Sequence, residues 1–146
     1  MNEIMTTNNN DAFALCKIFS SDDAYNLPAI RYSTTDDNTV LFNALNSPNE
    51  LVADYLDQEV NVEDIVITGI DFTDKFTGQD LNKPVVHFFT DEGVHISSIA
   101  NGILRTTLGL LRSGICPNAE HPITIRFRSV KVKRGTAHGF DVVNIG

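Results

Sequence analysis

The sequence predicts a mainly β domain in which five strands follow one another and a single helix separates the third strand from the fourth. From residue 59 onward, apolar and polar residues alternate in short runs separated by glycine and proline, which is typical of half-buried strands. Residues 97–113 instead repeat their apolar side chains at helical spacing. With 146 residues, 42% of them hydrophobic, the chain is long enough to bury a core without disulfides or a structural metal.

The predicted domain follows an N-terminal extension. The first ten residues are polar and rich in asparagine, and we expect them to be disordered. Residues 11–19 are apolar enough to be ordered, as a strand or as a short helix, and residues 20–38 have the composition of turns. We therefore predict a partly disordered extension over residues 1–38 and the folded domain over residues 39–146.

The first three predicted strands are a long strand and a hairpin. Residues 59–72 form the long strand, whose alternation slips twice, and such slips indicate bulges that bend a strand. A loop follows at residues 74–83. Residues 85–90 and 94–97 then pair across the turn at residues 91–93, where a glycine can adopt a positive φ angle.

The helix and the last two strands complete the domain. The helix begins at a cap on Ser97 or Ser98 and ends at about Ser113, before a glycine. Residues 123–133 and 140–145 form the fourth and fifth strands. Five strands with a helix after the third is the order of an OB-fold barrel. The alternative architecture is a helix lying across an open sheet.

Charge is distributed unevenly along the chain. The net charge is -8, but residues 1–70 hold two bases and twelve acids, whereas residues 71–146 hold nine bases and seven acids. Seven bases and one acid lie between Arg105 and Arg134. A local basic field on an acidic protein is what binding a polyanion at one face requires. Basic strand residues can instead serve only to solvate a sheet edge.

The predicted fourth strand carries most of this basic field. Its alternation shifts by one at Ser129, and a bulge there would keep its four bases on one face, since an unbroken strand would turn two of them into the core. These four bases and the arginine that follows are Arg126, Arg128, Lys131, Lys133 and Arg134. Such a row matches the phosphates of a single nucleic-acid strand, so binding should weaken steeply with salt.

The predicted hairpin supplies rings beside these cations. OB-folds bind single strands across strands two and three, between the loops that join strands one to two and four to five. If the apolar residues of the hairpin face the core, His87, Phe89 and His95 lie on the open face, with Phe89 directly across from His95. Bases stack on flat rings. The first loop adds Lys75, Phe76 and Lys83. The alternatives are ordinary core for Phe89 and exposed strand histidines with no ligand role.

The sequence shows no motif of a catalytic or metal site. Its two cysteines, Cys16 and Cys116, match no metal-binding spacing, and the nucleophile, phosphate-loop and zinc-protease patterns do not occur. There is no secretory signal and no apolar run long enough to span a bilayer. We therefore expect a non-enzymatic cytoplasmic protein without cofactor or metal.

Four runs of residues give the chain a family likeness. They are LFNALN at 41–46, DQEVNVEDI at 57–65, DEGVHISSIA at 91–100 and IRFR at 125–128, before a glycine at 135. Over residues 40–145 the chain resembles single-stranded DNA-binding proteins of small tailed bacteriophages, including those with protein-primed replication. The resemblance implies an OB-like fold and non-enzymatic coating of displaced strands during phage DNA replication, which protects them from nucleases and re-annealing.

The expected partner is therefore single-stranded DNA in the host cytoplasm. The acidic residues 1–70 would in addition contact replication proteins, and a homo-oligomer is compatible with the sequence. A second hypothesis is a phage structural or adaptor protein whose barrel packs against neighbouring proteins.

Overall fold

The computed structural model describes residues 29–46, 49–73 and 76–145 of the chain. Contacts divide the chain into two units: Ala29–Gly69 with Lys83–Gly146 form the larger one, and Ile70–Asn82 belong to the other. The predicted disordered start and the predicted ordered element at residues 11–19 lie outside the described residues.

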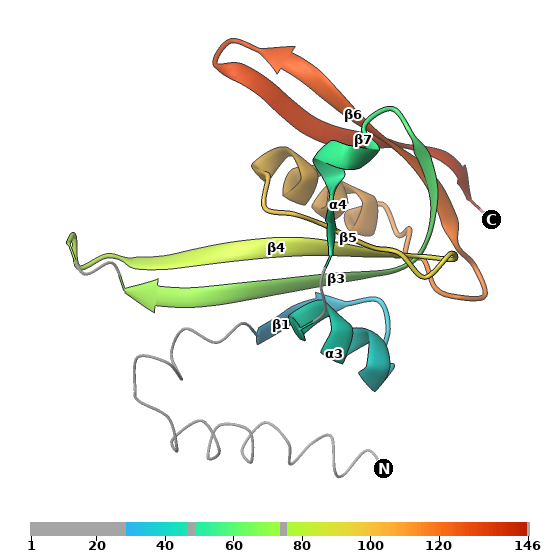
Figure 1. The fold of residues 1–146 in the computed structure, drawn as a ribbon, viewed down its shortest axis with the longest axis horizontal. Helices are drawn as coiled ribbons and strands as arrows, with labels where there is room; N and C mark the ends of the chain where they lie inside the picture. The colour runs from blue at the N-terminus through green and yellow to red at the C-terminus, as the bar shows by residue number, and fades with distance from the viewer. Residues whose placement is uncertain (1–28, 47–48, 74–75, 146) are drawn as a thin grey trace. The chain divides into compact units, whose positions relative to one another are not determined.

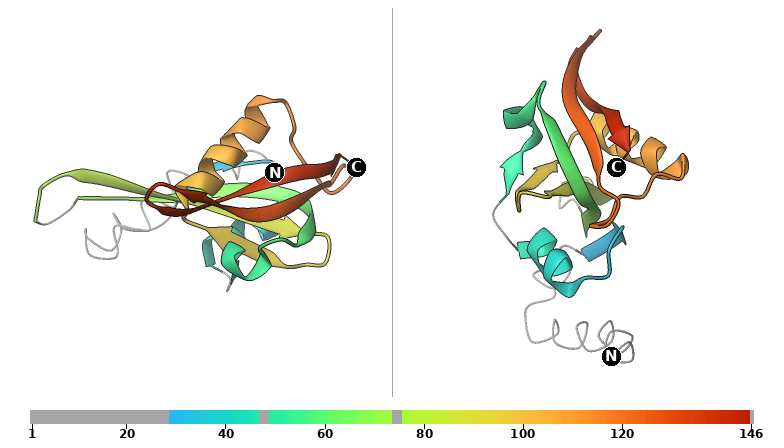
Figure 2. Two further views of the ribbon diagram at one scale, coloured as in Figure 1. Left: turned by 90° about the horizontal axis from the view of Figure 1, so that it is seen from above. Right: turned by 90° about the vertical axis from the view of Figure 1, so that its right-hand side faces the viewer.

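The larger unit is mainly β, with a curled, open sheet and two α-helices (Figures 1 and 2). In chain order the elements are β1 (Ala29–Ser33), α3 (Asn38–Asn46), β2 (Glu50–Leu51), the 3-10 helix η1 (Val52–Tyr55), β3 (Glu59–Thr73), β4 (Asp80–Thr90), β5 (His95–Ser98), α4 (Asn101–Arg112), β6 (Ile123–Val132) and β7 (Gly135–Ile145). The strands lie in the order β2-β5-β4-β3-β6-β7, and β1 pairs with β3. The mainly β class and the helix between the two groups of strands are confirmed, and two strands, β1 and β2, precede the predicted set.

β3 changes its partner along its length, which is where the sheet curls. β6 pairs antiparallel with residues 59–62 of β3, whereas β1 pairs antiparallel with residues 66–69. Residues 64–69 are buried on both faces of the strand. The slip of alternation near Asp64 therefore marks the point at which β3 passes from a half-buried to a fully buried environment.

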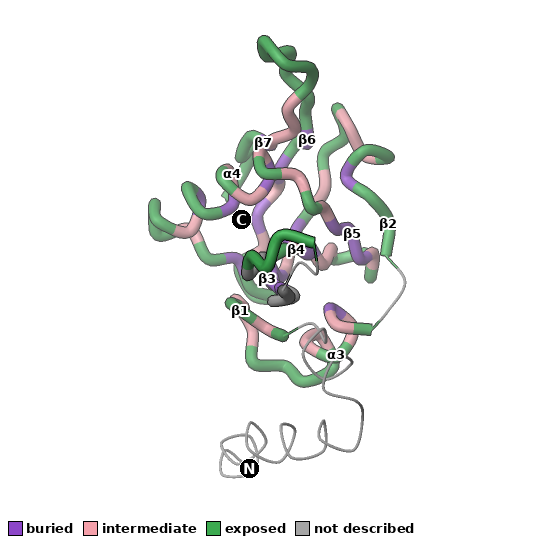
Figure 3. The backbone as a smooth tube through the Cα atoms, turned by 90° about the vertical axis from the view of Figure 1, so that its left-hand side faces the viewer, coloured by how far each residue is buried: buried purple, intermediate pink, exposed green. Residues whose placement is uncertain are grey.

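Aromatic rings fill the core between the sheet and α4. The ring of Phe88 meets those of Phe127 and Phe140 edge to face, with centroids 5.3 and 5.6 Å apart, an arrangement that the quadrupoles of aromatic rings favour. Ile103 and Leu110 of α4 belong to the same buried cluster. α4 thus covers this face of the sheet (Figure 3).

α4 begins later than predicted because the two serines expected to cap it belong to β5. Ser98 is the last residue of that strand, and its Oγ accepts a hydrogen bond from the N–H of Ala100. The helix then packs along β7 with Gly102 against the backbone of His138, where an added Cβ would lie 2.1 Å from the carbonyl oxygen. Only glycine fits at this contact.

The opposite face of the sheet is also covered. α3 lies on the other side of β3, β4 and β5 from α4 (Figures 1 and 3), and Ala44 of α3 is buried. The prediction of turns over residues 29–33 is wrong, because these residues form β1 and pair with β3. The larger unit therefore begins at Ala29, before the predicted domain start at residue 39.

Candidate nucleic-acid interface

The outer part of the β6–β7 hairpin projects from the larger unit (Figure 1). The two strands pair without interruption from Phe127 opposite Phe140 to Val132 opposite Gly135. Phe127 and Phe140 are buried, but no residue between 128 and 139 is. We call residues 128–139 the arm.

The arm is the most basic part of the larger unit. It carries four cations and no acid, which gives it a charge of +4: Arg128, Lys131, Lys133 and Arg134. Because the net charge of the chain is -8, all other residues sum to -12. A concentrated positive charge on a projecting hairpin attracts polyanions to that element and away from the rest of the surface.

The predicted bulge at Ser129 is wrong. Residues 128, 129 and 130 pair in register with residues 139, 138 and 137, and the only shift between β6 and β7 in the described pairing lies at Thr124/Ile125. Side chains alternate between faces in an unbroken strand, so Arg126 and Arg128 lie on one face and Lys131 on the other. The continuous stripe on one face therefore does not form.

The reason lies in where β6 leaves the core. An unbroken strand was expected to bury two bases, but both faces of β6 are exposed beyond Phe127. Lys131 consequently meets solvent on the face that is buried lower in the strand. Lys133 and Arg134 occupy the turn that joins β6 to β7.

Two of the predicted cations already have partners. Arg126 forms an ion pair with Glu59 of β3, and the Nε of Arg128 lies 3.4 Å from a carboxylate oxygen of Asp141. All four side chains are about half exposed, and pairs of this kind contribute only about 0–1 kcal/mol. A phosphate can therefore displace either carboxylate at little cost.

The other three cations can bind a phosphate without first losing an ion pair to another described residue. Within residues 29–46, 49–73 and 76–145, Lys131, Lys133 and Arg134 form no ion pair, and all three are exposed. They surround the tip of the arm, so a phosphate can approach them from either face.

The β4–β5 hairpin does not present the predicted open ring surface. Phe89 pairs directly with His95, as predicted, but His87 and His95 are only 4% and 9% exposed. The ring of Phe89 is partly buried and stacks on the ring of His95, with centroids 4.5 Å apart. The prediction of an exposed face is wrong for both histidines because this part of the sheet is covered on both sides.

The two histidines form a buried polar chain. Nδ1 of His87 lies 2.7 Å from Nε2 of His95, and Nε2 of His87 lies 2.9 Å from the hydroxyl of Thr68. Burial and the neighbouring His95 lower the pKa of His87 from 6.5 to about 4, and burial lowers the pKa of His95. Both rings are neutral at pH 7 and add nothing to the attraction of phosphate.

The predicted first loop does not extend the arm. Lys75 lies outside the described residues, and Phe76, which is 99% exposed, belongs to the smaller unit. Lys83 is exposed on β4, a strand that neighbours neither β6 nor β7 in the sheet.

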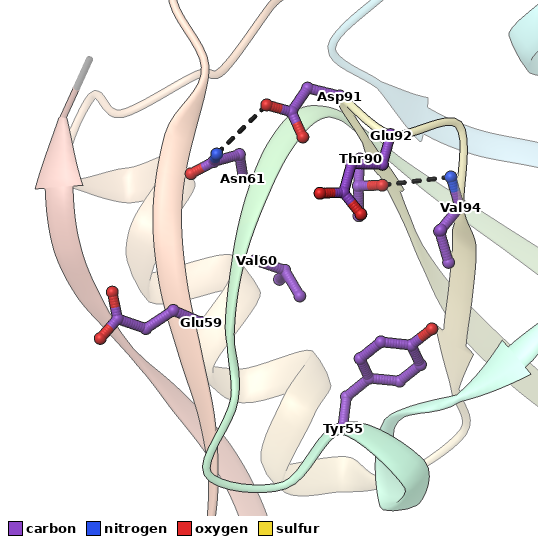
Figure 4. A pocket seen from close by; sticks show the side chains of 8 residues that line it. All are labelled: Tyr55, Glu59, Val60, Asn61, Thr90, Asp91, Glu92 and Val94. Carbon is purple, nitrogen blue, oxygen red and sulfur yellow. Dashed lines mark hydrogen bonds between the residues drawn. The ribbon is translucent and has the colours of Figure 1, made fainter.

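A small acidic hollow, which the sequence analysis missed, lies beside the start of β3 (Figure 4). It encloses about 110 Å³ and is lined by Tyr55, Glu59, Val60, Asn61, Thr90, Asp91, Glu92 and Val94. Val60 and Tyr55 point into it, whereas Glu59 points toward the neighbouring strand. Carboxylates repel phosphate, so the hollow limits how far a polyanion can extend from the arm. Its lining comes from η1, β3 and the β4–β5 turn, and only the pair of acids in that turn was visible as a local sequence signal.

Among the described residues, no group of three or more His, Cys, Asp or Glu side chains could hold a metal ion. No described helix is long and apolar enough to cross a membrane.

Comparison of the chain with protein-family models, with curated proteins and with solved structures gives no match. The resemblance to phage single-strand binders therefore stays a prediction.

Proposed function

We propose that the chain binds single-stranded DNA without strong sequence preference and without catalysing a reaction. In this role it coats displaced strands during DNA replication and protects them, as the resemblance to phage proteins implies. The observation that carries the proposal is the arm, which concentrates a charge of +4 on a projecting hairpin while the rest of the chain sums to -12.

The arrangement of strands supports an OB-like reading of the fold. β3, β4 and β5 precede α4, and β6 and β7 follow it, while β3 lies between β4 and β6 in the sheet. An OB-fold is a five-stranded, partly open barrel that binds nucleic acid across its strands. We propose that the curled sheet is an open variant of this barrel in which the binding surface has moved from the β4–β5 hairpin to the arm.

The charge of the arm supports the proposal and sets the salt dependence expected for binding a single strand. Each phosphate that a cation neutralises releases condensed counterions, and for single strands the slope of log affinity against log salt is about -0.7 for each phosphate. Four arm cations therefore give a slope of about -3 if each engages one phosphate. Because base edges need not be read, the affinity depends only weakly on sequence.

A fluorescence anisotropy titration tests the proposal. Labelled oligo-dT is titrated with the full chain at low and at high salt, first with the natural protein and then with Lys133→Gln/Arg134→Gln. The matched control is Arg105→Gln/Arg112→Gln, which removes the same charge from two exposed arginines of α4. Binding that is lost at high salt, weakened by the arm variant and retained in the control supports the proposal. Absence of binding by the natural protein at low salt overturns it.

The second candidate function is assembly with other proteins, and exposed aliphatic side chains on the arm favour it. Val130 and Val132 are 44% and 51% exposed, and aliphatic residues on a projecting hairpin suit a protein contact. Stable assemblies in solution without DNA, unaffected by the loss of the arm cations, would support this function over DNA binding.

A further inference from the structure

One face of the arm is apolar toward the tip, whereas at its base α4 lies close to Gly139, where an added Cβ would be 3.2 Å from Oγ1 of Thr106. Alternation along the unbroken β6 places Val130 and Val132 on the same face as Arg128. The cross-strand partners of these three residues are Ala137, Gly135 and Gly139 respectively. Because these cross-strand partners are small, they do not cover the two valine side chains, which agrees with the valine exposures of 44% and 51%.

Cations bracket this apolar face. Arg128 lies at its base, and Lys133 and Arg134 lie in the turn at its far end. With a rise of about 3.3 Å per residue, Arg128 and Val132 are about 13 Å apart along the strand. The opposite face is polar, because Ser129, Lys131, Thr136 and His138 occupy it. Phosphates attracted to either end would leave the intervening bases over the valines.

We propose that this face contacts the bases of the bound strand, with Val130 and Val132 packing against the methyl groups of thymine. This inference rests on the proposed single-stranded DNA binding and assigns its base contacts. Valine side chains offer no hydrogen-bond donor or acceptor, so they cannot read the polar edge of a base. Apolar contact with the C5 methyl group is the discrimination that such side chains provide, and thymine alone of the four DNA bases carries it. The same contact distinguishes thymine from uracil.

The experiment compares oligo-dT with oligo-dU of equal length, since the two differ only in that methyl group. Burying one methyl group strengthens binding by about fourfold, so the natural protein should bind oligo-dT about four times more tightly. Val130→Ser/Val132→Ser removes every γ-methyl group from the face and leaves small polar side chains, and should remove the difference. Val143→Ser is the matched control, because Val143 is 47% exposed on β7 outside the arm, and it should keep the difference.

Each outcome bears on the inference separately from the proposed function. Equal affinity for oligo-dT and oligo-dU, or a preference that survives in the double variant, overturns the inference and leaves single-strand binding standing. Failure of the natural protein to bind either oligonucleotide overturns both. A double variant that dissociates a protein assembly without changing DNA binding shows that the face is a protein contact, and also overturns the inference.

Discussion

Replacing Gly102 with alanine should weaken the attachment of α4 to β7 at the base of the arm. An added Cβ would lie 2.1 Å from the carbonyl oxygen of His138, and a backbone atom cannot rotate away as a side chain can. Overpacking of this kind costs about 1–3 kcal/mol. Alanine recovers at most about 1 kcal/mol through its better helix propensity, so the free energy of unfolding should fall by up to about 3 kcal/mol.

Gly109 supplies the internal control for this prediction. It lies in the same helix, and nothing lies within 4 Å of the position where its Cβ would be. Gly109→Ala should therefore stabilise the protein by up to about 1 kcal/mol. Urea unfolding at pH 7 measures both variants. Equal stabilities for the two variants would show that α4 does not press against β7 at Gly102, and would refute the packing described here.

Three other perturbations have defined outcomes. The pKa of His87 falls from 6.5 to about 4 on folding, so the unfolded chain binds more protons than the folded chain between these pH values. The free energy of unfolding should therefore fall by about 3 kcal/mol as the pH drops through this window. Urea unfolding of His87→Gln should show a correspondingly smaller fall, and an unchanged pH dependence would count against a buried, neutral His87. Glu59→Gln/Asp141→Asn removes the carboxylates that pair with Arg126 and Arg128. The variant should bind oligo-dT more tightly at low salt, by up to about fivefold for each pair removed. Weaker binding would mean that the carboxylates hold these arginines in the position that binds phosphate. Phe127→Ala removes one ring of the aromatic core and should lower stability by about 3–5 kcal/mol in urea unfolding, a loss that a solvent-exposed ring would not produce.

The order of elements after residue 59 could be predicted because it depends on local signals. Alternation, turn residues and helical spacing identify each strand and the helix without reference to its neighbours. The helix start was placed too early because Ser97 and Ser98 have the side chains of helix caps, yet both pair within the sheet. β1 was missed because its strand character comes from pairing with β3, more than thirty residues away, and its own composition indicates turns.

The site was harder to predict because burial depends on which elements meet in space. Alternation in β6 gives the two faces of the strand but cannot show that both become exposed after Phe127. The prediction of a bulge at Ser129 assumes that one face of β6 stays buried beyond Phe127, whereas both faces are exposed there. In the same way, alternation along the β4–β5 hairpin places His87 and His95 on the face opposite the aromatic core. Alternation does not show that this face is covered as well.

Amide chemical shifts during titration with oligo-dT test the central claim most directly, because they locate the bound strand residue by residue. The arm is predicted to respond: the amides of residues 129–138 should shift progressively, while those around the acidic hollow at residues 90–94 stay unchanged. Shifts confined to the β4–β5 hairpin, or no shifts at all at low salt, would contradict the assignment of single-strand binding to the arm.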